Sequence, residues 1–187
     1  FLTGLPLRTL GEKQIACAVQ DHRGCLAFVD MDNLKKINDV HGHKAGDRAL
    51  MTLGKLLARF ASNGYACRLG GDEFLLFFPD ITREEASEHM TQLFQQFHTL
   101  TRDDAEIQYA SLSAGLYMCS GNEPFPDCSS KADNALYYAK QNGKNQFSFY
   151  QPQIAHLAAS VSGAGNNLTQ IAKSLQDSGS YMGALNL

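Results

Sequence analysis

The sequence lacks the marks of membrane-spanning and secreted proteins. No apolar stretch is long enough to span a bilayer, and no signal peptide is recognisable. The five cysteines are odd in number and form no C-x-x-C pair, which argues against a disulfide framework or a zinc site and for a reducing compartment. We therefore expect a cytoplasmic protein, or the cytoplasmic domain of a larger protein that is itself membrane-bound.

A strong charge bias is also missing. The formal net charge is −3, so bulk electrostatics give no reason to expect nucleic-acid binding or membrane contact. The 187 residues are enough for one domain with a hydrophobic core. Because the chain begins at Phe1 without a methionine, we expect it to be a fragment.

The most informative motif is Gly70-Gly71-Asp72-Glu73-Phe74, which lies between two strand-like stretches at residues 65–69 and 74–78. Two strands joined at Gly-Gly indicate a tight hairpin, because glycine tolerates the positive φ that such turns need. The missing side chains also let a bulky ligand approach the backbone. The two acids then lie where a cation and a phosphate can meet. Taken alone, the motif is better explained as a surface hairpin with solvated acids.

A second polar cluster follows the apolar stretch at residues 25–29. Asp30 at the end of a buried strand is costly unless a metal or a hydrogen-bond donor offsets its desolvation. Oxygen ligands at such a strand end suit Mg²⁺. A basic helical turn follows, and the segment 41–47 ends a short helix and starts a long one. We expect Asp47 in the first turn of the long helix, where an acid complements the helix dipole; capping alone would also explain it.

Strand and helix patterns alternate along the chain. We predict helices at residues 6–20, 45–60, from 82, and at 130–141, and strands at 24–30, 65–78 (a hairpin), 109–118 and 146–150. Thr82 and Glu85 have the spacing of a capping box. The elements predict an α+β sandwich in which helices pack on a mostly antiparallel sheet. Residues 152–187 are rich in small and polar residues, and we interpret them as a linker or partly helical tail, with a flexible C-terminal tail as the alternative.

Five blocks of the chain resemble, in the same order, the GGDEF domain, which is the catalytic domain of diguanylate cyclases. They are Leu2-Thr3-Gly4-Leu5-Pro6, the segment from Asp30 to Asp39, Gly42-His43 with Gly46-Asp47, the turn from Gly70 to Phe74, and Ala132-Asp133 with residues 135–140 and Gly143-Lys144-Asn145. The resemblance covers residues 2 to about 150, so we expect a GGDEF domain at residues 1–151.

The resemblance implies a ferredoxin-like βαββαβ core, similar to nucleotidyl cyclases and polymerase palm domains. It also implies a bacterial signalling enzyme that condenses two GTP molecules into cyclic di-GMP and releases two pyrophosphates.

Roles for individual residues also follow from the resemblance. Mg²⁺, or Mn²⁺ in its place, would be held by Asp30, the main-chain carbonyl of Met31 and Asp72. Asp72 would also act as the general base. Glu73 would assist, although strand alternation points it away from Asp72. Lys35 would stabilise the transition state.

The nucleotide contacts are implied in the same way. Lys140 and Lys144 match the pair that holds the outer phosphates. Many relatives carry arginine at the second place, so Lys144 supplies a point charge instead of a bidentate fork. Gly70 and Gly71 would leave room for the nucleotide beside the turn.

Asn38 and Asp47 match the guanine-reading pair, with His43 in the same pocket. A carboxylate accepts hydrogen bonds from guanine N1–H and from the exocyclic amine. Adenine presents a lone pair at N1 and lacks that amine, so Asp47 favours GTP over ATP.

Two expectations concern regulation and assembly. Many relatives carry R-x-x-D shortly before the glycines as an allosteric site for the product, and the matching positions here are Ala61-Ser62-Asn63-Gly64, so we expect that form of inhibition to be absent. The two-fold product requires two chains facing each other, and no long coiled-coil heptads are present. We therefore expect a homodimer whose contacts come from a domain outside this sequence.

Two alternatives to an active cyclase remain open. A catalytically silent GGDEF domain would bind GTP or a partner and regulate a neighbouring domain, and the intact set of candidate site residues argues against it. A related nucleotidyl cyclase would form another product, which Asp47 disfavours.

Overall fold

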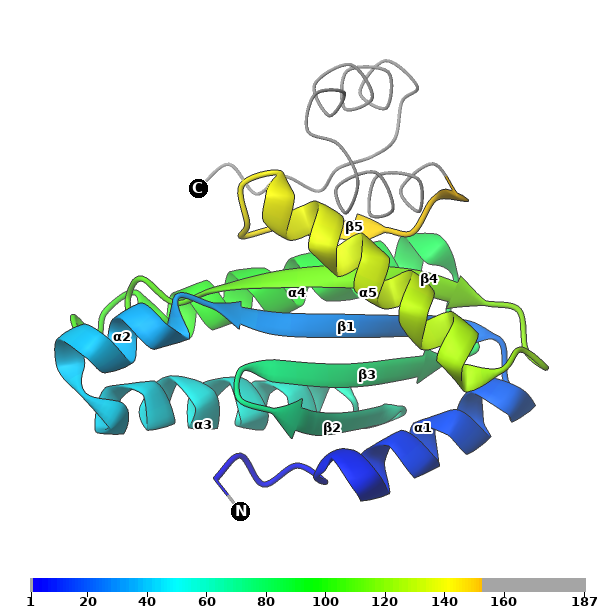
Figure 1. Cartoon of the computed structure of the whole chain (residues 1–187), viewed down its shortest axis with the longest axis horizontal. Helices are drawn as coiled ribbons and strands as arrows, with labels where there is room; N and C mark the ends of the chain where they lie inside the picture. The colour runs from blue at the N-terminus through cyan, green and yellow to red at the C-terminus, as the bar shows by residue number, and fades with distance from the viewer. Residues whose placement is uncertain (1, 153–187) are drawn as a thin grey trace, which may run out of the picture.

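A buried central strand organises the chain. In the computed structural model, which describes residues 2–152, β1 (Gly24–Asp32) runs through the middle of the sheet (Figure 1). It is buried at every position except Phe28. A strand that is enclosed on both faces has a continuous apolar run instead of an alternating one. This burial explains the unbroken apolar segment Cys25–Val29.

Five strands form one sheet in the order β2-β3-β1-β4-β5. The other strands are β2 (Tyr65–Gly70), β3 (Glu73–Pro79), β4 (Ser111–Cys119) and β5 (Phe147–Phe149). The pairs β2–β3, β3–β1 and β1–β4 are antiparallel, and β4–β5 is parallel. The mostly antiparallel sheet predicted from the sequence is thus confirmed, as is the α+β class.

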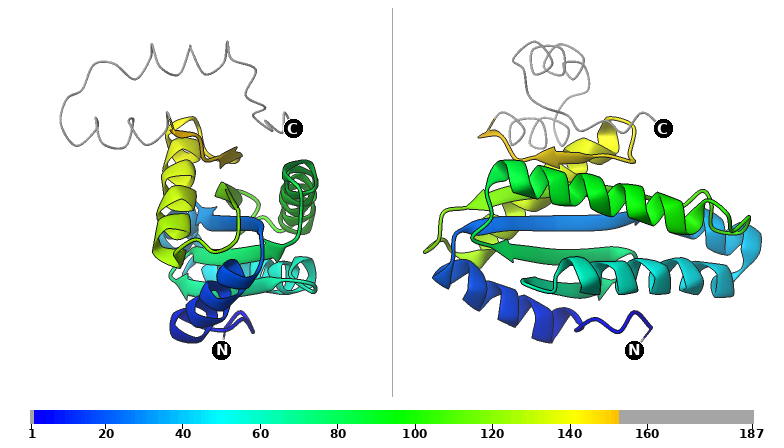
Figure 2. Two further views of the ribbon diagram at one scale, coloured as in Figure 1. Left: turned by 90° about the vertical axis from the view of Figure 1, so that its right-hand side faces the viewer. Right: turned by 180° about the vertical axis from the view of Figure 1, so that it is seen from behind.

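Helices cover both faces of this sheet (Figure 2). On one face lie α1 (Arg8–Asp21) and α5 (Phe125–Gln141), and on the other lie α2 (Leu34–His41), α3 (His43–Phe60) and α4 (Arg83–Thr101). The order β1, α2–α3, β2, β3, α4, β4 is the expected βαββαβ core, which α5 and β5 extend.

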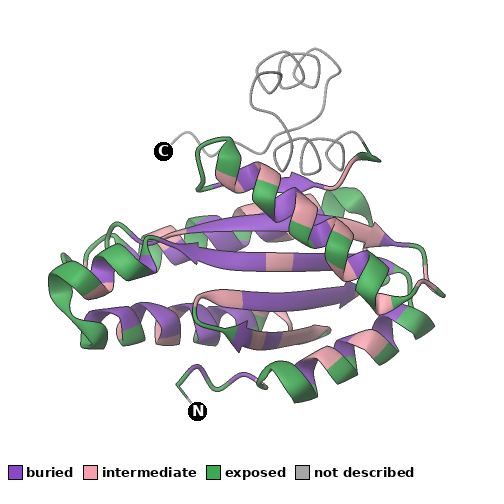
Figure 3. Ribbon diagram, viewed as in Figure 1, coloured by how far each residue is buried: buried purple, intermediate pink, exposed green. Residues whose placement is uncertain are grey.

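Each face of the sheet has its own hydrophobic core, and the exposed positions of the helices lie on their outer sides (Figure 3). Side chains alternate along β1, so Ala27 and Val29 pack with α3 and α4, whereas Leu26 packs with α1. By the same alternation Asp30 and Asp32 continue the series of Leu26. The two acids therefore lie on the face of the sheet that α1 and α5 cover.

Most predicted elements are confirmed with boundaries shifted by a few residues. The capping box is also present: the Thr82 hydroxyl accepts a hydrogen bond from the Glu85 backbone N–H at 3.2 Å, and the Thr82 N–H donates to Glu85 Oε2 at 2.8 Å. One placement was wrong. Because α3 begins at His43, Asp47 lies beyond its first turn, which contains no acid, so helix capping does not account for this residue.

The helix predicted at residues 130–141 begins earlier, at Phe125. Pro126 falls in the first helical turn, where the missing N–H would have no intrahelical partner, so proline is accommodated there. This helix lies very close to the sheet at Gly115. A Cβ atom at Gly115 would come within 2.0 Å of the Leu136 backbone nitrogen and 2.1 Å of the Ala132 oxygen, so only glycine fits.

Within residues 2–152, no helix is both long and apolar enough to cross a bilayer. The segment predicted as a linker or tail lies, from residue 153 onward, outside the described residues. The domain boundary near residue 151 therefore stays a prediction.

Candidate active site

The hairpin that joins β2 and β3 forms one side of the site. Gly71 has a φ of 51°, a left-handed value that favours glycine, and added Cβ atoms at Gly70 and Gly71 would meet nothing within 4 Å. The Arg68 guanidinium donates two hydrogen bonds to the Gly71 carbonyl, at 2.6 and 3.1 Å. The turn is therefore held by the Arg68 side chain and has open space beside both glycines.

The end of β1 is fastened to this hairpin. Asp30 is paired in register with Glu73, and the Met31 N–H donates to the Asp72 carbonyl oxygen at 3.0 Å. The two acidic motifs, far apart in the sequence, thus meet at one edge of the sheet.

A cleft of about 460 Å³ lies at this edge. Six of the sequence-predicted site residues line it: Asp30, Met31, Lys35, Asp72, Lys140 and Lys144. They come from β1, from α2, from the hairpin, from the end of α5 and from the turn that follows α5. The cleft therefore collects acidic and basic side chains from segments that lie far apart in the sequence.

The electrostatics of the cleft centre on Asp30. This residue is only 5% exposed, and its Oδ2 accepts from the Lys140 ammonium at 2.7 Å. Burial raises the pKa of Asp30 from 3.8 to about 6, while the hydrogen bond and charge of Lys140 oppose that rise and the neighbouring Asp72 adds to it. A buried acid with a raised pKa is typical of a functional site and is also found in structural ion pairs.

The donor set is suited to a hard divalent cation. Asp30, Asp72 and Met31 line the same cleft. Carboxylate and main-chain carbonyl oxygens are the ligand types that Mg²⁺ prefers. Among the described residues, no three His, Cys, Asp or Glu side chains are grouped to hold a metal ion. A two-carboxylate site leaves the remaining positions to water and substrate phosphates, as is usual for Mg²⁺.

Three predicted residues lie outside the lining of this cleft, on the α2–α3 pair. The Asn38 side chain packs against Gly46, where a Cβ atom would come within 2.0 Å of Asn38 Oδ1. His43 and Asp47 are exposed on the first two turns of α3. The predicted guanine readers therefore share one helical hairpin, next to the cleft but on other elements than Asp30 and Asp72.

Glu73 is also absent from the residues that line the cleft. Its Oε2 lies 3.7 Å from the guanidinium of Arg8 at the start of α1. Strand alternation predicts this divergence from Asp72. Arg8 also donates from Nε to the Leu69 carbonyl oxygen at 3.0 Å, so α1 holds the strand that leads into the hairpin.

Asp32 lines the cleft and was missed by the sequence interpretation. It is 2% exposed and accepts hydrogen bonds from Ser111 and Ser113. The sequence did contain a signal for it: side chains two residues apart on a strand lie on the same face, so Asp32 must lie on the same face as Asp30.

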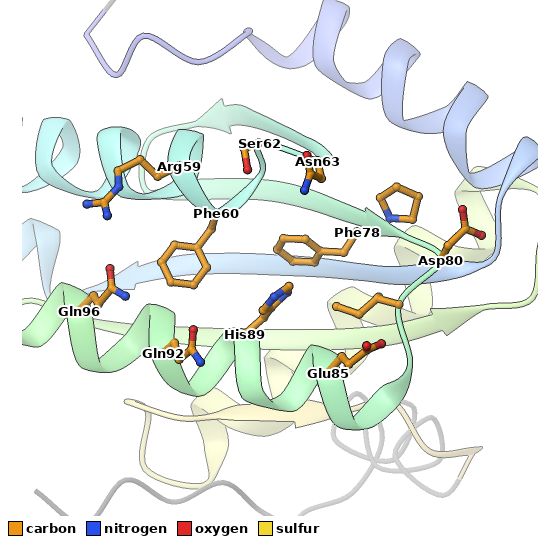
Figure 4. A pocket seen from close by; sticks show the side chains of 12 residues that line it. Arg59, Phe60, Ser62, Asn63, Phe78, Asp80, Glu85, His89, Gln92 and Gln96 are labelled. Atoms are coloured by element: carbon orange, nitrogen blue, oxygen red, sulfur yellow. The ribbon is translucent and has the colours of Figure 1, made fainter.

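A second pocket, of about 520 Å³, lies between the end of α3 and α4 and includes two of the positions at which R-x-x-D is absent, Ser62 and Asn63 (Figure 4). Among the described residues that line it, Arg59 is the one arginine or lysine, whereas Asp80 and Glu85 are acidic. Phosphate groups would therefore meet two acids and a single guanidinium in this pocket.

Comparison with known proteins agrees with this arrangement. The family model described as diguanylate cyclase, GGDEF domain, matches residues 1–146. The probable diguanylate cyclase DgcE of Escherichia coli (strain K12) is 34% identical over 164 residues, which are 82% of this chain and 15% of that protein. The bifunctional diguanylate cyclase/cyclic di-GMP phosphodiesterase MucR of Pseudomonas aeruginosa is 32% identical over 164 residues, 82% of this chain and 23% of that protein. The chain thus spans less than a quarter of the length of these two relatives.

Solved structures show the same fold. The GGDEF domain of DgcB from Caulobacter crescentus, in complex with c-di-GMP, matches with a TM-score of 0.72 and 26% identity over 80% of this chain and 93% of that one. The active GGEEF domain of a diguanylate cyclase from Vibrio cholerae matches with a TM-score of 0.65 and 28% identity over 79% and 98% of the two chains. The blocks that carried the resemblance, the βαββαβ core and the cleft between the two acidic motifs thus have one explanation: the chain belongs to the GGDEF domain family of diguanylate cyclases.

Proposed function

We propose that this domain is an active diguanylate cyclase, which joins two GTP molecules into cyclic di-GMP. Each ribose 3′-hydroxyl attacks the α-phosphate of the other nucleotide, so two P–O bonds form and two pyrophosphates leave. The observation that carries the proposal is the cleft in which Asp30, Asp72 and lysines from separate segments converge. Such a mixture matches the charges of a metal-bound triphosphate.

Asp30, Asp72 and the carbonyl oxygen of Met31 are the groups that would hold Mg²⁺, or Mn²⁺ in its place. When bound, the metal would lower the pKa of the attacking hydroxyl and neutralise charge on the phosphates. Asp72 is also the candidate general base, because it lines the cleft whereas Glu73 is turned toward Arg8. Glu73 then acts indirectly, through the position of the hairpin.

The lysines supply the opposite charge. Lys140 and Lys144 lie at the end of α5 and in the turn after it, on the α1/α5 side of the sheet edge, and are assigned to the outer phosphates. Lys35, exposed on the first turn of α2, is assigned to the charge that develops during transfer. Each is a point charge, so the phosphates are positioned by the arrangement of several lysines and not by one bidentate contact.

Specificity for guanine is assigned to Asn38 and Asp47, with His43 beside them. All three lie on the α2–α3 hairpin, which begins directly after the metal-binding edge of β1. Because Asp47 is exposed and not used by the helix as a cap, its carboxylate can accept from guanine N1–H and the exocyclic amine. With adenine, the N1 lone pair would instead face the Asp47 carboxylate, so that one acceptor would lie against another.

The product has two equivalent bonds, whereas each chain supplies one cleft. Two chains must therefore face each other in a two-fold arrangement, each presenting its GTP hydroxyl to the other's α-phosphate. The dimer contacts are assigned to a domain outside this sequence.

Incubation with GTP and Mg²⁺, followed by mass identification of the product, tests the proposal. Asp72→Ala and Asp30→Ala should both eliminate cyclic di-GMP while leaving a cooperative thermal transition, since each removes a metal ligand and no core packing. Asp103→Ala is the matched control, because this acid is 87% exposed and does not line the cleft. A silent domain would bind GTP and release no pyrophosphate, and a different cyclase would give a product of another mass.

A further inference from the structure

Of the two acids in the cleft that the proposed chemistry does not use, Asp39 is exposed on α2, whereas Asp32 is buried. It ends β1, is 2% exposed, and its carboxylate accepts from neutral donors. The Ser111 hydroxyl lies 3.0 Å from Oδ2, and the Ser113 hydroxyl lies 3.0 Å from Oδ1 and 2.9 Å from Oδ2. The backbone N–H of Asn145 donates to Oδ2 at 3.3 Å.

These donors occupy the acceptor sites that a metal ligand would need. Three donors reach this carboxylate: Ser111 and the Asn145 N–H at Oδ2, and Ser113, whose single hydroxyl hydrogen is shared between Oδ1 and Oδ2. Together they fill most of the capacity of a carboxylate. Asp30, two residues earlier on the same face, has only the Lys140 ammonium as its side-chain partner within residues 2–152. The two acids are therefore divided between different tasks.

The Asn145 contact joins Asp32 to the turn that carries Lys144. Gly143, Lys144 and Asn145 have φ values of 110°, 61° and 47°, so three successive residues adopt left-handed backbone. Non-glycine residues seldom take this conformation unless surrounding contacts impose it. Here the Lys144 N–H donates to the Ala139 oxygen at 3.2 Å, and Asp32 receives the next N–H along the chain.

A separate contact holds the other end of this turn to the sheet. The Ala114 N–H donates to the Gln146 carbonyl oxygen at 3.0 Å, and the Gln146 amide donates to the Ala139 oxygen, also at 3.0 Å. Within the described part of the chain, Asp32 adds the one hydrogen bond that links the backbone of residues 143–145 to the end of β1. Without it the turn stays attached to β4 and α5 but has no direct hydrogen bond to the end of β1, where the metal ligands are proposed.

We propose that Asp32 is a positioning residue that fixes the Gly143–Asn145 turn, and with it the Lys144 ammonium, at the distance from β1 that a triphosphate requires. The inference rests on the proposed function, in which Lys144 contacts the outer phosphates. Asp32 itself touches neither nucleotide nor metal. Its effect on substrate is transmitted through the Asn145 N–H to the neighbouring lysine.

Binding measurements separate this role from a general loss of stability. In the presence of Mg²⁺, a non-hydrolysable GTP analogue should bind about tenfold more weakly to Asp32→Ala than to the wild-type protein, and GMP, which lacks the outer phosphates, should bind equally well to both. Lys144→Ala should show the same pattern. The double variant should bind the analogue no more weakly than Lys144→Ala alone, because the positioned group is already gone.

Two further variants complete the design. Asp32→Asn keeps an oxygen that can accept from the Asn145 N–H, so it should restore most of the analogue affinity. If Asp32→Ala does not fold, Asp32→Ser replaces it. The serine hydroxyl can still form hydrogen bonds with Ser111 and Ser113, but it is one bond too short to reach the Asn145 N–H. Ser111→Ala is the control, because it removes a bond to Asp32 and leaves the Asn145 contact in place.

The outcomes are distinct. Equal weakening of GMP and the GTP analogue, or additive effects of the Asp32 and Lys144 substitutions, would overturn the inference. A wild-type protein that makes no cyclic di-GMP but retains the coupling between Asp32 and Lys144 would overturn the proposed function and leave the positioning role supported.

Discussion

Replacing Asp30 by asparagine should make the metal-free protein more stable at neutral pH while abolishing its activity. Asp30 is buried, and its pKa rises from 3.8 to about 6 on folding, mainly because of that burial. A carboxyl with a higher pKa in the folded state binds its proton more tightly there, so folding stability is lost as pH rises from about 4 to about 6. Above about pH 6 the carboxylate is ionised in the folded protein, and the full free-energy cost of burying its charge lowers the stability.

The size of the effect follows from the shift. About two pKa units correspond to roughly 3 kcal/mol at about 1.4 kcal/mol per unit. An asparagine side chain cannot ionise, so Asp30→Asn should gain up to about 3 kcal/mol over wild type at pH 7.5 and almost nothing at pH 4. For a chain of this length that gain raises the melting temperature by roughly 2–4 °C per kcal/mol.

The assay is urea denaturation in EDTA at several pH values between 4 and 7.5, with Asp103→Asn as an exposed-acid control. Adding Mg²⁺ should then stabilise the wild-type protein more than Asp30→Asn, since the ionised carboxylate is the proposed ligand. A stability difference that stays flat across this pH range, or an Asp30→Asn protein less stable than wild type at pH 7.5, would refute the reasoning. The Asp30–Lys140 pair would then be a net stabilising contact.

Four further predictions concern specificity, packing, inhibition and assembly. Asp47→Ser should narrow the preference for GTP over ATP in competition kinetics, and an unchanged ratio would remove Asp47 from the guanine pocket. Gly115→Ala should lower the free energy of unfolding by about 2–3 kcal/mol or more, because its Cβ would meet the α5 backbone at 2.0 Å and the helix would have to move; a melting temperature within roughly 1–2 °C of wild type would contradict this packing. Cyclic di-GMP titrated calorimetrically should show no tight binding that depends on residues 61–64, and tight binding lost on substituting that segment would oppose the prediction. Specific activity should rise with protein concentration, and a dimerising helix fused before Phe1 should raise it at low concentration; activity per molecule that is constant over roughly hundredfold dilution of a monomer would exclude the two-fold mechanism.

Much of the local structure could be read from the sequence because it depends on neighbouring residues. The Gly-Gly turn follows from the φ values that only glycine adopts easily, and Thr82 with Glu85 forms its capping box within one helical turn. Motif order also identified the family before any contact was known. The start of α5 was predicted five residues too late, at residue 130, whereas the helix begins at Phe125 and accommodates Pro126 in its first turn.

The tertiary structure decided which charges meet. Lys140 reaches Asp30, and Asn145 reaches Asp32 across 113 positions of the chain, because α5 packs against β4 at Gly115 and ends beside β1. No local pattern encodes such distances, since they result from the packing of two hydrophobic cores on opposite faces of one sheet. The sequence by itself determined the family, the turn and the residue types of the site. The raised pKa of Asp30 and the separate task of Asp32 depend on burial and on distant donors, which only the folded chain brings together.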